Sequence, residues 1–198
     1  MKDWTGNSRS AIVTIGGNNY TQEDRAQRDF YATPPEAVVG LLEKECFNSA
    51  IWEPAAGMLH ISKTLKNYGY YVFSSDIECR CEGIEKIDFL SVNSDEKYEG
   101  DIITNPPYST AELFIKKALD LVQTGNKVAM LLRIQFLEGI KRRRLFDESP
   151  PFKVYVFSRR ITCGKNGDFD SSRNSNAMSF AWFVWKKGYK GKTVIDWI

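Results

Sequence analysis

Short apolar runs alternate with longer amphipathic stretches along most of the sequence, and this alternation limits the folds that the chain can adopt. The apolar runs predict strands at about 50–52, 70–74, 101–104, 127–132, 154–157 and 179–185. The amphipathic stretches predict helices at about 33–42, 59–68, 109–123 and 135–146. Because strands that alternate with helices form a mostly parallel sheet with helices on both faces, we expect an α/β fold.

The chain divides into an N-terminal arm and one folded domain. Residues 1–28 are polar, contain the cluster Gly16-Gly17-Asn18-Asn19 and lack an apolar period, which predicts a flexible arm. Residues 29–198 are expected to form a single domain, because 198 residues correspond to about one domain of ordinary size. The polar residues before the strand at 179–185 are expected to form a loop without structure of its own.

Two helix starts have the spacing of a capping box, in which a Ser or Thr precedes a Glu by three residues. Thr33 and Glu36 form the first pair, and Ser109 and Glu112 form the second. We therefore expect Thr33 and Ser109 to be N-caps, with proline in the first turn of the first helix.

Several functional classes are disfavoured by the composition. No apolar run approaches the roughly 18 residues of a membrane span, and Met1 to Asn7 lacks the apolar core of a signal peptide, so we expect a cytoplasmic protein. A zinc site is not expected either, because the four cysteines form no C-x-x-C pair and His60 is the only histidine. The formal charge of +2 is too small to indicate a nucleic-acid partner by itself.

Unusual residues follow two of the predicted strands, at the sheet edge where open parallel sheets bind ligands. Glu53-Pro54-Ala55-Ala56-Gly57 is a turn of small residues before a helix, which allows a ligand to approach the backbone closely. Asp76 ends the next strand, a position where an acid commonly accepts hydrogen bonds from ribose hydroxyls. Together they suggest an adenosine-containing cofactor. The sequence lacks G-x-G-x-x-G and G-x-x-x-x-G-K-[ST], which disfavours NAD and nucleoside triphosphates.

A third strand, at 101–104, runs into Asn105-Pro106-Pro107-Tyr108. With this NPPY turn the chain resembles the S-adenosylmethionine-dependent amino-methyltransferases, in particular the N6-adenine DNA methyltransferases. The resemblance covers most of residues 29–133, in the order that the family shows. Residues 181–185 also resemble the corresponding segment of small phage- and prophage-encoded members.

The resemblance implies a Rossmann-like methyltransferase fold, with a mostly parallel seven-stranded sheet whose last strand is antiparallel. It implies S-adenosylmethionine as the cofactor and DNA as the partner. The implied cofactor-binding residues are Tyr31, Thr33, Glu53, Pro54, Ala55, Gly57, Asp76, Asp88 and Phe89. Tyr31 and Thr33 would hold the methionine end, Asp76 the ribose, and Asp88 and Phe89 the adenine ring. The chain departs from the family at residues 58–60, Met-Leu-His, where a second glycine is usual.

The implied catalytic residues are Asn105, Pro106, Pro107 and Tyr108. The exocyclic amine of adenine is a poor nucleophile, because its lone pair is delocalised into the ring. Two acceptors on its hydrogens, the Asn105 side-chain oxygen and the Pro106 carbonyl, would draw the nitrogen toward a tetrahedral geometry. Proline makes the turn rigid, and Tyr108 offers a face on which an extruded base can stack. This chemistry requires no metal.

Two other readings stay open. The NPPY motif also occurs in enzymes that methylate a protein glutamine, and an RNA adenine would present the same amine. The glutamine enzymes usually carry an additional helical N-terminal domain, which residues 1–28 are too few to form. A catalytically silent nucleic-acid-binding module with this fold is the third reading, and the intact Asn105 and Tyr108 disfavour it.

A nucleic-acid surface is expected beside the strand ends, because the backbone must be held while a nucleotide is extruded. Basic residues follow the late strands or lie in the polar loop, where they can release counterions from a polyanion. The expected contacts are Lys141, Arg142, Arg143, Arg144, Arg159, Arg160, Lys165 and Arg173.

Overall fold

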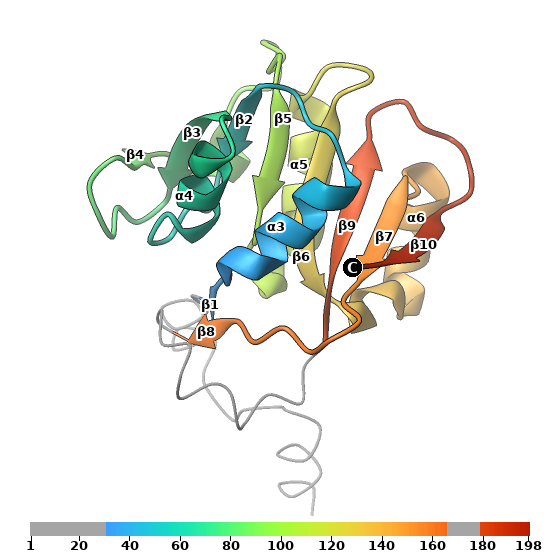
Figure 1. The fold of residues 1–198 in the computed structure, drawn as a ribbon. Coiled ribbons are helices and arrows are strands. Elements are labelled where there is room, and N and C mark those ends of the chain that lie inside the picture. Colours follow the sequence, from blue (N-terminus) through green and yellow to red (C-terminus); the bar gives the residue numbers. More distant parts are fainter. Residues whose placement is uncertain (1–30, 166–178) are drawn as a thin grey trace, which may run out of the picture.

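A computed structural model describes residues 31–165 and 179–198. The predicted arm at 1–28 and Arg173 lie outside these residues. The described residues form one eight-stranded sheet and a separate pair of short strands (Figure 1). The large sheet has the order β10-β7-β9-β6-β5-β2-β3-β4. Its strands are β2 (Ala50–Glu53), β3 (Tyr71–Asp76), β4 (Glu85–Lys86), β5 (Asp101–Thr104), β6 (Lys127–Arg133), β7 (Lys153–Val156), β9 (Phe180–Lys186) and β10 (Val194–Trp197).

The sheet is parallel except for β9, which lies antiparallel between β6 and β7. This arrangement confirms the predicted α/β class and the antiparallel strand at 179–185. The predicted number of seven strands was one too low, because β10 adds a further strand parallel to β7. Sequence patterning missed β10 because it is an edge strand with mostly exposed side chains, so it lacks the buried apolar run of the other strands.

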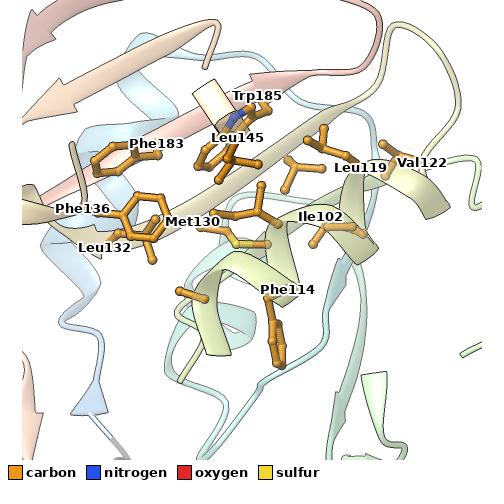
Figure 2. Packing of buried hydrophobic residues seen from close by; sticks show 14 of the residues in the cluster. Ile102, Phe114, Leu119, Val122, Met130, Leu132, Phe136, Leu145, Phe183 and Trp185 are labelled. Atoms are coloured by element: carbon orange, nitrogen blue, oxygen red, sulfur yellow. The ribbon is translucent and has the colours of Figure 1, made fainter. Parts of the chain in front are cut away.

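Helices cover both faces of the sheet, as predicted. Figure 1 shows α3 (Pro35–Lys44) and α4 (His60–Asn67) in front of the sheet, with α5 (Ala111–Leu121) and α6 (Arg143–Glu148) behind it. Alternate residues of the central strands point to opposite faces, so Ile102 and Met130 pack in one core cluster and Ile103 and Leu131 in the other. Figure 2 shows the first cluster, which includes Ile102 of β5, Met130 of β6 and Phe114 of α5. No helix in the described ranges is both long and apolar enough to cross a bilayer.

Both predicted capping boxes were wrong. Helix α3 begins at Pro35, its N-cap is Pro34, and no side chain caps it. Thr33 instead accepts a hydrogen bond from the Asn105 side chain, at 3.2 Å, which uses its hydroxyl in a tertiary contact. Ser109 lies in the 3₁₀ turn η2 (Tyr108–Thr110), and α5 begins after Thr110 without a side-chain cap. The chain thus tightens into a 3₁₀ turn directly after the NPPY prolines.

Two predicted segments differ from the structure. The helix expected at 135–146 is divided into the 3₁₀ turns η3 (Ile134–Leu137) and η4 (Ile140–Arg142) and the short helix α6, because Gly139 has a φ of 106° that a helix cannot contain. The expected loop before 179 contains β8 (Gly164–Lys165), which pairs antiparallel with β1 (Tyr31–Ala32). This small sheet lies at the carboxyl end of β5, below the main sheet in Figure 1.

Candidate functional site

A pocket of about 320 Å³ opens at the carboxyl ends of β2, β3 and β5. It brings together all of the predicted cofactor-binding and catalytic residues except Gly57. From the predicted cofactor set it is lined by Tyr31, Thr33, Glu53, Pro54, Ala55, Asp76, Asp88 and Phe89. From the predicted catalytic set it is lined by Asn105, Pro106, Pro107 and Tyr108. These residues come from five segments that are distant in sequence, and the parallel sheet gathers them at one edge.

Gly57 does not line the pocket but fixes the position of a residue that does. Its backbone N–H donates to Asp76 Oδ2 at 2.8 Å, so the turn after β2 is tied to the end of β3. The turn is further held by the Ala56 N–H, which donates to the Ser75 carbonyl at 3.0 Å. Leu59, two residues after Gly57, has a left-handed backbone with a φ of 65°. The absence of a second glycine is therefore accommodated by a strained leucine.

Glu53 is a buried carboxyl group, with a side chain that is only 1% exposed. Its Oε2 atom accepts hydrogen bonds from the Ser62 N–H, at 2.8 Å, and from the Ser62 hydroxyl. The Ser62 hydroxyl also lies 2.6 Å from that of Ser74. Burial raises the pKa of Glu53 to about 8, although the bonds from Ser62 favour the charged form. At neutral pH, Glu53 is therefore mostly protonated in this structure.

The pKa of Glu53 predicts a pH dependence of stability. Between its ordinary value of 4.5 and about 8, the folded protein keeps the proton that the unfolded chain releases. The free energy of unfolding should then fall as the pH rises through this window, by up to about 1.4 kcal/mol per pH unit. Glu53→Gln removes this titration, so its urea midpoint should change less between pH 5 and 8. If the urea midpoints of wild type and Glu53→Gln changed equally with pH, Glu53 would have its ordinary pKa in the folded protein.

The acids of the pocket are held by backbone contacts. Besides Gly57, Asp76 accepts a hydrogen bond from the Glu78 N–H on its Oδ1 atom, at 3.0 Å. Asp88 caps the 3₁₀ turn η1 (Phe89–Ser91), since its carboxylate accepts from the Leu90 N–H at 3.0 Å and the Ser91 hydroxyl at 2.6 Å. Each carboxylate is oriented at the mouth of the pocket and keeps lone pairs for another donor.

Asn105 is fixed in the NPPY turn through its side-chain nitrogen. Nδ2 donates to the Tyr31 carbonyl at 2.9 Å and to the Thr33 hydroxyl at 3.2 Å. A carbonyl can only accept a hydrogen bond, so the nitrogen must face β1 and the oxygen must face away from it. The Asn105 Oδ1 atom is buried and has no hydrogen-bond partner among the described residues. The side chain thus presents an oriented, unsatisfied acceptor at the pocket.

Tyr108 is packed among other side chains more closely than the sequence indicated. Its ring lies 5.8 Å from the ring of Tyr31 and 5.9 Å from that of Phe180, measured between centroids. The guanidinium carbon of Arg133 lies over the ring, 4.9 Å from the centroid. Burial raises the pKa of the Tyr108 hydroxyl well above its ordinary value, and Arg133 and Asn105 offset part of this rise. That hydroxyl nevertheless has no partner in hydrogen-bond geometry within the described ranges.

The sequence analysis missed several residues around the pocket. Arg133 and Phe180 lie against the Tyr108 ring without lining the pocket; Phe180 belongs to the strand predicted at 179–185, and Arg133 follows the strand predicted at 127–132. His60, Ile77 and Arg80 line the pocket itself. All of these residues lie at or directly beyond a strand end or at the start of a helix, except Arg80, which lies in the loop between β3 and β4. A position near a strand end was the only feature of the sequence that could have indicated a role at the pocket, because the residue types alone did not.

The predicted basic residues fall into two groups beyond the carboxyl ends of β6 and β7. Arg142 donates to the Glu138 carbonyl at 2.6 Å and lies over the Phe136 ring, so it fixes its own loop. Arg143 and Arg144 form ion pairs within α6, with Asp147 and Glu148. The remaining predicted residues are placed as follows: Lys141 is exposed before α6, Arg159 and Arg160 are exposed after β7, and Lys165 belongs to β8.

In the ranges 31–165 and 179–198, no three His, Cys, Asp or Glu side chains gather as metal ligands would. Comparison with protein families gave no matching family model, and comparison with curated proteins gave no match.

The fold does match solved structures. A Listeria monocytogenes protein assigned to the class I S-adenosylmethionine-dependent methyltransferases superposes with a TM-score of 0.60 at 13% identity, over 96% of this chain and 71% of the other. A predicted O-methyltransferase of Agrobacterium tumefaciens gives 0.58 at 11% identity, over 83% and 85%. The type IIG restriction endonuclease BpuSI gives 0.54 at 16% identity, over 79% of this chain and 24% of that protein. The chain therefore has the Rossmann-like fold of the class I S-adenosylmethionine-dependent methyltransferases.

Proposed function

We propose that the protein transfers a methyl group from S-adenosylmethionine to the N6 amine of adenine in DNA. The observation that carries this proposal is the state of Asn105. Its side chain is locked through the nitrogen, and its buried oxygen lacks a donor in the described part of the chain. A buried acceptor without a donor costs about 1 to 3 kcal/mol, so its retention at a pocket supports a ligand that supplies an N–H.

The pocket suits S-adenosylmethionine as the cofactor. The carboxylate of Asp76 can accept from ribose hydroxyls, while Phe89 and Ile87 offer apolar surface to an adenine ring. When bound, this cofactor supplies an electrophilic methyl group on a sulfonium. The fold shared with S-adenosylmethionine-dependent enzymes also supports this assignment.

The residues of the NPPY turn would prepare the amine. The Asn105 Oδ1 atom and the Pro106 carbonyl, which accepts no hydrogen bond within the described ranges, would each accept one of the two amine hydrogens. Two such bonds favour a tetrahedral nitrogen whose lone pair can attack the methyl group. As the N–C bond forms, the bond from the methyl carbon to the sulfonium would break with its electron pair going to sulfur, and the nitrogen would release one proton to water, so the product amine carries one methyl group and no net charge. The rigid proline backbone keeps both acceptors in place before the amine arrives.

DNA as the substrate is supported by the surface around the pocket. Exposed basic residues follow the carboxyl ends of β6 and β7, on the edge of the sheet where the pocket opens. One structural neighbour is a restriction endonuclease, in keeping with this substrate. An adenine inside a duplex cannot reach a pocket at strand ends, so the target nucleotide must be extruded.

The proposal is tested by expressing the full chain in a host that lacks DNA methylation and sequencing its DNA for N6-methyladenine. We expect modified adenine at one short recurring site with the wild-type protein and none with Asn105→Ala. Unmodified DNA, together with methyl transfer to RNA or to a glutamine-containing peptide in vitro, would move the assignment to one of those substrates. Failure with every acceptor, despite binding of S-adenosylmethionine, would support the silent binding module.

Asp76→Ala should raise the Kd for S-adenosylmethionine about 10- to 100-fold, because a hydrogen bond to a charged group is worth about 1.5 to 3 kcal/mol. Since Asp76 also accepts from Gly57, the alanine variant loosens the turn as well. Asp76→Asn keeps an acceptor for Gly57 and serves as the matched variant. Isothermal titration of both variants separates the two effects, and an unchanged Kd in both would place the ribose contact elsewhere.

A further inference from the structure

Arg133, the last residue of β6, lies beside the NPPY turn, and no acid of residues 31–165 or 179–198 pairs with it. Its guanidinium carbon is 4.9 Å from the centroid of the Tyr108 ring. The Arg133 Nε atom is buried and has no hydrogen-bond partner among the described residues. None of the ion pairs found in the described ranges includes Arg133. The guanidinium is thus held by an aromatic ring and not by an acid.

The nearby surface arginines are in a different state. Arg142 is bound to backbone carbonyls, and Arg143 and Arg144 are paired with acids of their own helix. Guanidinium presents five N–H donors in one plane, and this fork matches the oxygens of a phosphate. A buried Nε atom without an acceptor in the described part of the chain therefore points to a ligand that brings acceptors with it.

Arg133 is also the neighbour of Tyr108 that can leave most easily. All three neighbours have paired backbones, Tyr31 with β8 and Phe180 with Arg133 itself, so only a side-chain movement can uncover the ring. The Arg133 side chain has a long flexible stem, and it can turn without breaking a strand. Its planar head stacks on a ring much as a nucleic-acid base does.

We propose that Arg133 covers the stacking face of Tyr108 in the free protein and, when a nucleotide is extruded, leaves the ring to bind a backbone phosphate of that nucleotide. The base then takes the place of the guanidinium. The inference rests on the proposed function, since it needs an extruded base at the NPPY turn. Base stacking replaces the cation–π contact, and the phosphate satisfies donors that the ring cannot. Arg133 is therefore a positioning residue that couples backbone binding to base capture.

Two fluorescent probes, one with phosphates and one without, test this exchange. The first is a single-stranded thymidine oligonucleotide with one 2-aminopurine, and the second is free 2-aminopurine deoxyriboside. Stacking on Tyr108 should quench both. In Arg133→Ala, the affinity for the oligonucleotide should fall about tenfold at roughly 0.1 M salt. The slope of log affinity against log salt should flatten by about 0.7, the value for one phosphate contact on a single strand. The affinity for the nucleoside should stay the same or rise, because no cation competes for the ring.

Lys192→Ala is the matched control. Lys192 is an exposed cation that precedes the first residue of β10, so it lies near the amino ends of the parallel strands and not near the carboxyl ends, where the pocket opens. This variant should change neither affinity. Arg133→Lys keeps the charge, so it should restore most of the salt slope, and thermal melting confirms that each variant folds. Equal losses for both probes, or no loss for either, would overturn the exchange. If wild type methylates adenine in DNA, such a result rejects only the role of Arg133. If wild type quenches neither probe, the exchange fails together with base capture at the NPPY turn.

Discussion

Replacing Asn105 by alanine should lower kcat for methyl transfer about 100- to 1000-fold, the usual cost of removing one preorganised group that acts in the transition state. The alanine variant lacks the Oδ1 acceptor and also the two bonds that Nδ2 makes, to the Tyr31 carbonyl and the Thr33 hydroxyl. The Kd for S-adenosylmethionine should stay nearly unchanged, because Asn105 acts on the amine and not on the methyl donor. Single-turnover transfer to DNA and titration of the cofactor measure the two quantities separately.

Two further variants separate the role of Asn105 as a hydrogen-bond acceptor from the orientation of its side chain. Asn105→Asp keeps an acceptor but cannot donate to the Tyr31 carbonyl, so the side chain would lose its fixed direction. Thr33→Val keeps Asn105 and removes the second contact, at 3.2 Å; because Thr33 also lines the cofactor pocket, its activity is compared at saturating S-adenosylmethionine. We expect the activity of Thr33→Val to lie between wild type and Asn105→Ala. Turnover of Asn105→Ala within a few fold of wild type would exclude the NPPY turn from the chemistry.

Local sequence patterns predicted the central part of the fold accurately. The strand expected at 101–104 is β5, and that at 127–132 differs from β6 by one residue. These segments are short apolar runs buried on both faces, so their pattern follows directly from their environment. Because parallel strand ends share one edge, predicting the strands was enough to bring Asp76 and Asn105 to the same pocket.

Long-range partners could not be predicted in the same way. Nothing near Tyr31 indicates that it pairs with Lys165, and nothing near Thr33 indicates that its hydroxyl accepts from Asn105 and does not cap a helix. The pattern at 135–146 is helical except for Gly139, whose left-handed backbone divides the segment. The first two outcomes depend on contacts between residues that are distant in sequence. The third depends on a backbone conformation that glycine permits but does not require.

The second large effect is expected far from the pocket, at the amino ends of β6 and β7. Glu45, directly after α3, is buried at 4% exposure and receives three donors. Lys127 lies 2.6 Å and Lys153 2.8 Å from its carboxylate oxygens, and the Tyr155 hydroxyl donates to Oε1 at 2.5 Å. Burial alone raises the pKa of Glu45, but the bonds from the two lysines and from Tyr155 outweigh it, so the pKa lies below its ordinary value.

Glu45→Ala should lower the free energy of unfolding by about 3 kcal/mol, the lower part of the range for breaking a buried ion pair. The lower part applies because the lysine side chains are 18% and 29% exposed and can reach water with their charged ends. For a domain of this size, the melting temperature should then fall by about 6 to 12 °C. Urea unfolding measures the free energy, and the slope of its dependence on urea should not change.

The matched control is Glu43→Ala, an exposed acid two residues earlier in the last turn of α3, which should change stability by less than about 0.5 kcal/mol. The difference between wild type and Glu45→Ala should persist above pH 4.5 and shrink as the pH falls through the lowered pKa of Glu45, because protonation removes the charge that the lysines stabilise. Methyl transfer per folded molecule should be the same in both, since the lysine and tyrosine partners of Glu45 lie at the edge of the sheet opposite the pocket. A loss of activity larger than the loss of folded protein would show instead that the two edges are coupled through β6, which begins at Lys127 and ends at Arg133.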